Sequence, residues 1–145
     1  MADPPVTVEV DGHILTVTLN RPEKRNAINS HVMCLLADAW RRLDEDPELR
    51  VAILTGNGTT FCAGMDLVEI GLMAQPEPAN EYMARLRQDP GMLWRAWLKT
   101  DLPRKPIILA VEGFARAGGT EILQGTDIRV AISLALASAP PSSTT

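Results

Sequence analysis

The sequence contains two short stretches with no polar side chain on either face, Val51-Ala52-Ile53-Leu54 and Ile107-Ile108-Leu109-Ala110-Val111. Runs of this length that are apolar on both faces are typical of strands buried on both sides, as in parallel sheets between helices. Each run gives way to a loop that contains glycine, Thr55-Gly56-Asn57-Gly58 after the first and Glu112-Gly113 after the second. We therefore expect two buried strands in a sheet built with crossover connections.

The segment before the first apolar run predicts a β-hairpin over residues 6–19. Apolar residues alternate with polar ones on both sides of Asp11-Gly12, a pair that tolerates the positive φ angles of a tight turn. The alternating apolar residues are Val6, Val8, Val10, Leu15, Val17 and Leu19. Arg21-Pro22 ends the second strand, because proline has no N–H to donate to a ladder.

The other segments supply helices and a further strand. Residues 30–45 carry an apolar stripe at helical spacing, and Asn29 or Ser30 can cap this helix by accepting a bond from a first-turn amide. The remaining predicted elements are a helical segment over 78–99 with a break near Pro90-Gly91, a helix over 118–125 and a strand over 127–131. This order of strands and helices predicts an α/β fold.

Composition excludes several classes of protein. The chain has 145 residues, of which 46% are hydrophobic and 22% are charged, enough for one domain with a buried core. Its 14 basic and 18 acidic residues give a formal net charge of −4, which disfavours nucleic acid as an electrostatic partner. We expect no membrane span and no secretory signal, since there is no long apolar run and the start is Met1-Ala2-Asp3-Pro4-Pro5.

The two cysteines, Cys34 and Cys62, are too few to form a zinc site by themselves, and no metal site is expected. We interpret both as reduced thiols, which predicts a cytoplasmic protein.

The end of the sequence changes character. No charged side chain follows Arg129, and alanine, serine, proline and threonine dominate the last residues. We therefore expect a core over residues 1–131 and a divergent low-complexity tail over 132–145 that is disordered at its end.

Two loops could carry chemistry, Thr59–Leu67 and Gly113–Glu121, because each follows an apolar run and is rich in small residues. Open α/β sheets bind ligands at the carboxyl ends of their strands, and small residues let a ligand approach the backbone. If each loop leads into a helix, two amides that converge on one oxygen would form an oxyanion hole. The alternative is a pair of ordinary strand-to-helix turns, and neither loop alone decides between them.

The charged residues near these loops can each be interpreted either as functional groups or as ordinary structural ones. Glu121 lies three residues after Gly118, where a carboxylate can act as a general acid or base or can complement the helix dipole. Arg21, Lys24 and Arg25 form a basic cluster that is either a solvated loop or a phosphate contact.

Four segments, in this order, resemble the enoyl-CoA hydratase/isomerase (crotonase) superfamily. They are Asn20–Asn29, Phe61–Leu67, Ala110–Glu121 and Thr126–Ala131, and the resemblance runs from about residue 6 to residue 131. It implies a crotonase-like spiral of ββα units, here incomplete and without the C-terminal helical region. It also implies an acyl-CoA thioester as ligand, with no cofactor beyond the coenzyme A that is part of the substrate.

The resemblance assigns roles to particular residues. The amides of Met65 and Gly118 would form an oxyanion hole for an enolate-like intermediate, and Glu121 matches the first of two catalytic glutamates of the hydratases. Arg25 and Ala27 would lie beside the nucleotide and pantetheine of coenzyme A. The remaining substrate-binding residues would be Ala63, Gly64, Met65, Asp66, Leu67, Val68 and Gly118.

The sequence departs from the family after Ala131. Pro141 lies about where the second catalytic glutamate belongs, and no acidic residue follows Asp127. The sequence therefore also fits a truncated or frameshifted product, impaired or inactive, or a member of the family with other acyl-CoA chemistry. The family implies a homotrimer or hexamer, which a chain without the C-terminal helices would lack the means to build.

Overall fold

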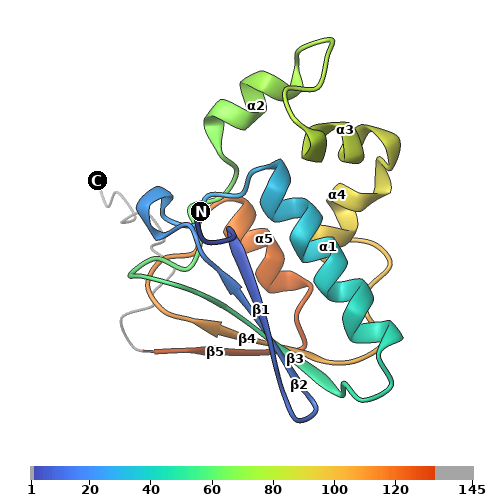
Figure 1. Ribbon diagram of the computed structural model, residues 1–145. Helices are drawn as coiled ribbons and strands as arrows, with labels where there is room; N and C mark the ends of the chain where they lie inside the picture. Colours follow the sequence, from blue (N-terminus) through green and yellow to red (C-terminus); the bar gives the residue numbers. More distant parts are fainter. Residues whose placement is uncertain (1, 133–145) are drawn as a thin grey trace, which may run out of the picture.

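Residues 2–132 are described by the computed structural model of the protein, in which five strands form one sheet, and Figure 1 shows its arrangement. The sheet order follows the chain: β1 (Val6–Asp11), β2 (Ile14–Leu19), β3 (Val51–Gly56), β4 (Ile107–Val111) and β5 (Ile128–Ala131). β1 and β2 pair antiparallel, and every later pair is parallel. The predicted hairpin is confirmed, with Gly12 at φ = 56° in its turn.

Of the helices in residues 2–132, α1, α2 and α3 begin at residues whose side chains cap them. They are the 3₁₀ helix η1 (Pro22–Lys24) and the α-helices α1 (Ser30–Glu45), α2 (Leu67–Met73), α3 (Glu81–Gln88), α4 (Gly91–Ala96) and α5 (Gly118–Gln124). The Asn29 side chain accepts a hydrogen bond from Val32 N at 2.9 Å and caps α1. The helical segment predicted over 78–99 is divided into α3 and α4 around Pro90, which confirms the expected break.

Helix α2 is absent from the sequence-based prediction. Asp66 caps it by accepting a hydrogen bond from Val68 N at 3.0 Å, and Glu69 follows in the first turn. Leu67 and Val68 are exposed, so α2 shows no apolar stripe that faces the core. An acidic cap followed three residues later by a glutamate was the local signal for this helix.

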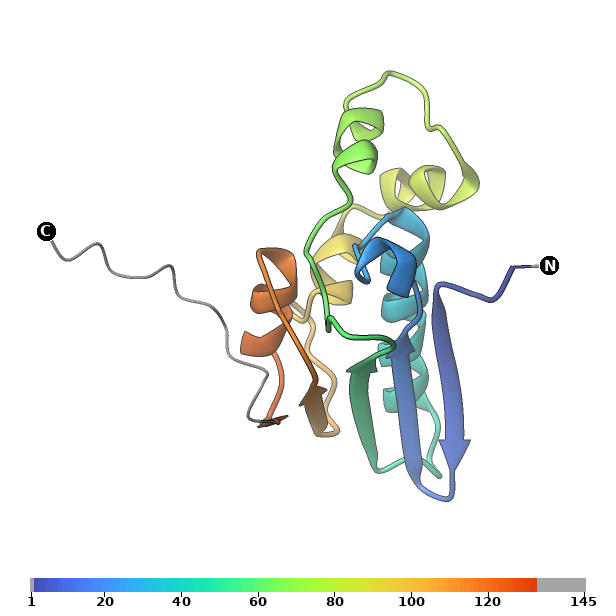
Figure 2. The ribbon, with the colours of Figure 1, turned by 90° about the vertical axis from the view of Figure 1, so that its left-hand side faces the viewer.

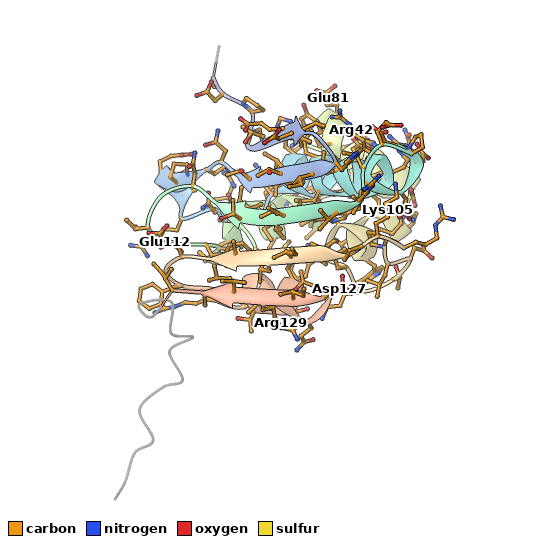
Figure 3. The ribbon with its side chains drawn as sticks, turned by 90° about the horizontal axis from the view of Figure 1, so that it is seen from below. Arg42, Glu81, Lys105, Glu112, Asp127 and Arg129 are labelled. Carbon is orange, nitrogen blue, oxygen red and sulfur yellow. The ribbon has the colours of Figure 1, made fainter. Side chains whose placement is uncertain are left out.

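The expectation that the apolar strands are buried on both faces is wrong for residues 2–132. In β4 the side chains of Ile107, Leu109 and Val111 are buried, whereas Ile108 and Ala110 are only partly buried. The reason is that the helices lie on one side of the sheet and leave its other face uncovered (Figures 2 and 3). β5 is an edge strand whose four residues are all exposed.

The core lies between the sheet and α1. Buried side chains of α1, among them Met33, Leu36 and Leu43, join those of the sheet in one cluster. Trp40 Nε1 donates to Ala96 O at 3.1 Å and fixes α4 against α1. Trp97, the residue that follows α4, lies against Gly118 at the start of α5.

Residues 133–145, which hold all of the predicted tail except Ile132, lie outside the described residues. Within residues 2–132 no helix combines the length and apolar character needed to cross a bilayer.

Candidate active site

The two loops singled out in the sequence lie side by side beyond the carboxyl ends of β3 and β4. Cys62 N donates to Phe114 O at 3.1 Å, and Arg116 N donates to Cys62 O at 2.9 Å. These bonds form an isolated parallel bridge between Cys62 and Ala115. The register of one loop against the other is therefore fixed by backbone hydrogen bonds.

The segment that precedes α1 binds the other side of the first loop. Ile28 N donates to Gly64 O at 2.8 Å, and Asp66 N donates to Ile28 O at 2.9 Å. Ala63 N donates to Arg25 O at 2.9 Å. The structure thus brings Arg25 and the segment through Ile28, which includes Ala27, beside the loop from Ala63 to Asp66.

The amides of Met65 and Gly118, which the family resemblance singles out, are among those in the two loops without an acceptor in the described part of the chain. The neighbouring amides of Gly64 and Asp66 are engaged, but the Met65 N–H donates to no acceptor within residues 2–132. The same holds for the Gly118 N–H, although Gly119 N donates to Arg116 O at 2.8 Å. A methyl group on Gly64 would lie 3.2 Å from Gly118 N, so the backbones of the two loops are in close contact there.

Ala117, which immediately precedes α5, has a backbone conformation that favours glycine. Its φ is 45° and its ψ is −120°, although it is not a glycine. This region is sparsely populated by residues with a Cβ, and holding one there costs roughly 1–3 kcal/mol. The conformation turns the chain sharply between Arg116 and Gly118, so strain is stored next to one of the available amides.

We predict that Ala117→Gly stabilises the fold by about 1 kcal/mol, because glycine adopts this φ without a steric penalty. Urea denaturation would measure the change. Ala84→Gly, inside α3, is the control and should destabilise by about 0.5–1 kcal/mol. Equal losses in both variants would show that Ala117 is unstrained.

Both glycines that begin α5 are required by close packing. A Cβ on Gly118 would overlap the Cη2 atom of Trp97, and a Cβ on Gly119 would lie 2.7 Å from Cys62 O. Trp97 is 8% exposed and lies just after α4, far from Gly118 in the sequence. It is absent from the predicted site, because no local pattern links it to the second loop.

Cys62 is a packing residue of the first loop. Its thiol is fully buried and accepts a hydrogen bond from Gly64 N at 3.3 Å. Burial raises the pKa of Cys62 to about 11, and the opposing effect of that hydrogen bond is smaller. Cys62 is therefore a thiol at neutral pH, and Cys34 is likewise a free, buried thiol.

Glu121 lies in the first turn of α5, and its side chain is about half exposed, at 49%. Its Oε2 lies 3.6 Å from Lys99 Nζ, and the same ammonium donates to Gln124 Oε1 at 3.2 Å. The carboxylate is thus open to solvent and paired with one cation. Its position, three residues after the Gly118 amide, places it on the same helical turn as the available donor.

An ion pair connects the basic cluster to the first loop. Arg21 Nη1 and Nη2 each donate to Asp66 Oδ2 at 3.1 Å, and Nη1 also donates to Ala27 O at 2.6 Å. Burial alone would raise the pKa of Asp66, but the bonds from Arg21 and Val68 N and the arginine charge outweigh it and lower that pKa. The Asp66 carboxylate therefore holds the loop and caps α2.

A lowered pKa for Asp66 makes its contribution depend on pH. The ionised form is favoured by the fold, so this stabilisation is present above the ordinary aspartate pKa and is lost as pH falls through the lowered value. We predict that Asp66→Asn lowers the free energy of unfolding by about 1–2 kcal/mol at neutral pH and that the difference narrows below about pH 4. Denaturation of both proteins across pH would show this. Asp11→Asn, at an exposed position in β1, is the control and should change the free energy of unfolding at neutral pH by less than about 0.5 kcal/mol.

Fold and loops together define an α/β protein in which two backbone loops meet beyond the ends of adjacent parallel strands. Residues 9–141 match the model of the enoyl-CoA hydratase/isomerase family, and the chain belongs to that family. Within residues 2–132, no group of three or more histidine, cysteine or acidic side chains is arranged to hold a metal ion.

Relatives resemble the chain over most of its length. Enoyl-CoA hydratase EchA19 of Mycobacterium tuberculosis is 49% identical over 128 residues, which cover 88% of this chain and 46% of the relative. An (E)-benzylidenesuccinyl-CoA hydratase of Thauera aromatica is 40% identical over 132 residues, with the same two coverages.

The fold is shared with solved structures of the family. The crystal structure of an enoyl-CoA hydratase from Mycobacterium tuberculosis H37Rv has a TM-score of 0.70 and 40% identity, covering 89% of this chain and 46% of that one. The predicted crotonase-like fold class is therefore confirmed, and the chain spans about half the length of the curated relatives it matches.

Proposed function

We propose that this chain binds an acyl-CoA thioester and polarises its carbonyl with the Met65 and Gly118 amides. The carrying observation is that both N–H groups lack an acceptor within residues 2–132 while hydrogen bonds hold their loops together. When a thioester is converted to an enolate, negative charge accumulates on its oxygen, and preorganised backbone donors stabilise that charge. Coenzyme A arrives as part of the substrate, so no separate cofactor is needed for this step.

Glu121 is the proposed proton carrier. In the hydration of an enoyl thioester, the hydroxyl of water bonds to the β-carbon and a proton is added to the α-carbon. A carboxylate on the first turn of α5 would take a proton from the attacking water and return one to the enolate carbon. Its side chain is 49% exposed and lies beside Lys99, so water can reach the carboxylate.

A second candidate function is binding without efficient turnover. Glu121 pairs with Lys99, and no second carboxylate lies on α5. General acid–base assistance typically contributes about 10²–10⁴-fold, so a site with one carboxylate would lose a factor of that order. Other acyl-CoA chemistry would use the same oxyanion hole.

Hydration of crotonyl-CoA, followed by the loss of enone absorbance, tests the first candidate. We expect turnover that falls by at least about 10²-fold in Glu121→Gln and is unchanged in Glu112→Gln, an exposed residue just after β4 (Figure 3). Calorimetric titration with the same thioester separates the candidates. Binding without turnover supports the second candidate, and the absence of binding contradicts both.

A further inference from the structure

A cavity of about 510 Å³ lies beside the candidate active site. It is lined by Arg25, Thr60, Ala63, Phe114 and Arg116, so it touches the basic loop and both of the loops that meet beyond β3 and β4. Arg25 and Ala63 belong to the substrate-binding residues that the family resemblance implies. Phe114 and Arg116 do not, and their role is open.

The cavity carries uncompensated positive charge. Every ion pair within residues 2–132 involves other cations, and neither Arg25 nor Arg116 lies within 4.0 Å of a carboxylate. Both arginines are exposed, and no acidic residue lines the cavity. In a chain with a formal net charge of −4, this is a local site for an anion.

Phe114 holds the second arginine in place. The Arg116 guanidinium lies over the Phe114 ring, with its carbon 5.0 Å from the ring centroid. A guanidinium attracted to the face of an aromatic ring keeps its N–H groups free, and these can bind a phosphate with two parallel hydrogen bonds. This contact therefore holds a phosphate donor at the wall of the cavity.

We propose that Arg116, held by Phe114, joins Arg25 in binding a phosphate at the nucleotide end of coenzyme A. The proposal rests on the acyl-CoA function proposed above. The cavity volume lies within the range of small-molecule sites, and the Ala63 wall connects it to the loop that carries the Met65 amide. A ligand that reaches from this cavity to Met65 would place its phosphates and its thioester at the two ends of one site.

Titration of coenzyme A, dephospho-coenzyme A and adenosine 3′,5′-bisphosphate tests the proposal, with each variant checked for thermal unfolding. Arg116→Gln should weaken coenzyme A binding at least about 10-fold, and Arg116→Lys should recover part of the loss. Arg50→Gln, which replaces an exposed arginine that does not line the cavity, should bind as the parent does. Unchanged affinity in Arg116→Gln would overturn the proposal.

The ligands also identify the phosphate and separate this proposal from the thioester function. If the 3′-phosphate is bound, the preference for coenzyme A over dephospho-coenzyme A disappears in Arg116→Gln; if the diphosphate is bound, both ligands weaken equally. Binding of adenosine 3′,5′-bisphosphate that depends on Arg116, without thioester binding, would support the phosphate site and contradict the oxyanion role. Thioester binding that is unchanged in Arg116→Gln would contradict the phosphate site and leave the oxyanion role supported.

Discussion

Gly113→Ala is expected to lower the free energy of unfolding by about 2–5 kcal/mol, a large share of the stability of the fold. Gly113 has a φ of +74°, and a Cβ there would overlap Thr59 O, a backbone atom that no side-chain rotation can move away. The positive φ costs about 1–2 kcal/mol and the overlap about 1–3 kcal/mol more. Domains of this kind are stable by only about 5–15 kcal/mol, so the urea midpoint should fall steeply or the protein should become insoluble.

Gly12→Ala is the matched control for that experiment. Gly12 also has a positive φ, +56°, but a Cβ there would meet nothing within 4 Å. Its substitution should therefore cost only the conformational part, about 1 kcal/mol. Equal losses at Gly12 and Gly113 would show that the contact with Thr59 does not fix the second loop against the first.

The sequence predicted the elements whose patterns are local. Alternating apolar residues around Asp11-Gly12 were sufficient for the hairpin, and the break at Pro90 followed from proline chemistry. Helix α2 was not predicted, because its apolar residues Leu67, Val68 and Ile70 are exposed and do not form a stripe that packs on the core.

The burial of the strands could not be predicted from their composition. Ile108 and Ala110 have the same apolar character as their neighbours in β4, yet they alternate with the buried residues of that strand and are only partly buried. The apolar character of a strand residue shows that it can be buried, but whether it is buried depends on which other elements pack against that face of the sheet.

The loops of the candidate site were predicted from their small residues, but their partners were not. Trp97 lies against Gly118 in a fold where Trp40 holds α4 against α1. Arg116 lines the same cavity as Arg25 in a fold where the backbone pairs Cys62 with Ala115. These are long-range consequences of packing, and residue spacing in the sequence does not encode them locally.

The contact between Trp97 and Gly118 leads to a second large prediction. A Cβ on Gly118 would overlap Trp97 Cη2 and lie 2.9 Å from Cζ3, and the indole is too buried to move aside freely. We expect Gly118→Ala to destabilise the protein by about 2–3 kcal/mol and to displace the start of α5. If the Gly118 amide binds the thioester oxygen, thioester affinity should fall as well. Gly71→Ala in α2, where a Cβ would meet nothing within 4 Å, should instead be neutral or stabilising by up to about 1 kcal/mol.

A double-mutant cycle attributes this loss to the indole. Trp97→Phe removes the outer ring atoms that a Cβ on Gly118 would strike, so in its background Gly118→Ala should cost at least about 1 kcal/mol less than in the parent. Urea denaturation measures the free energy of unfolding of all four proteins. Strict additivity would mean that the loss comes from the α5 backbone itself. A non-additive result would instead show that the indole at position 97 tolerates only glycine at position 118, because the indole occupies the space beside the Gly118 amide that a Cβ would need.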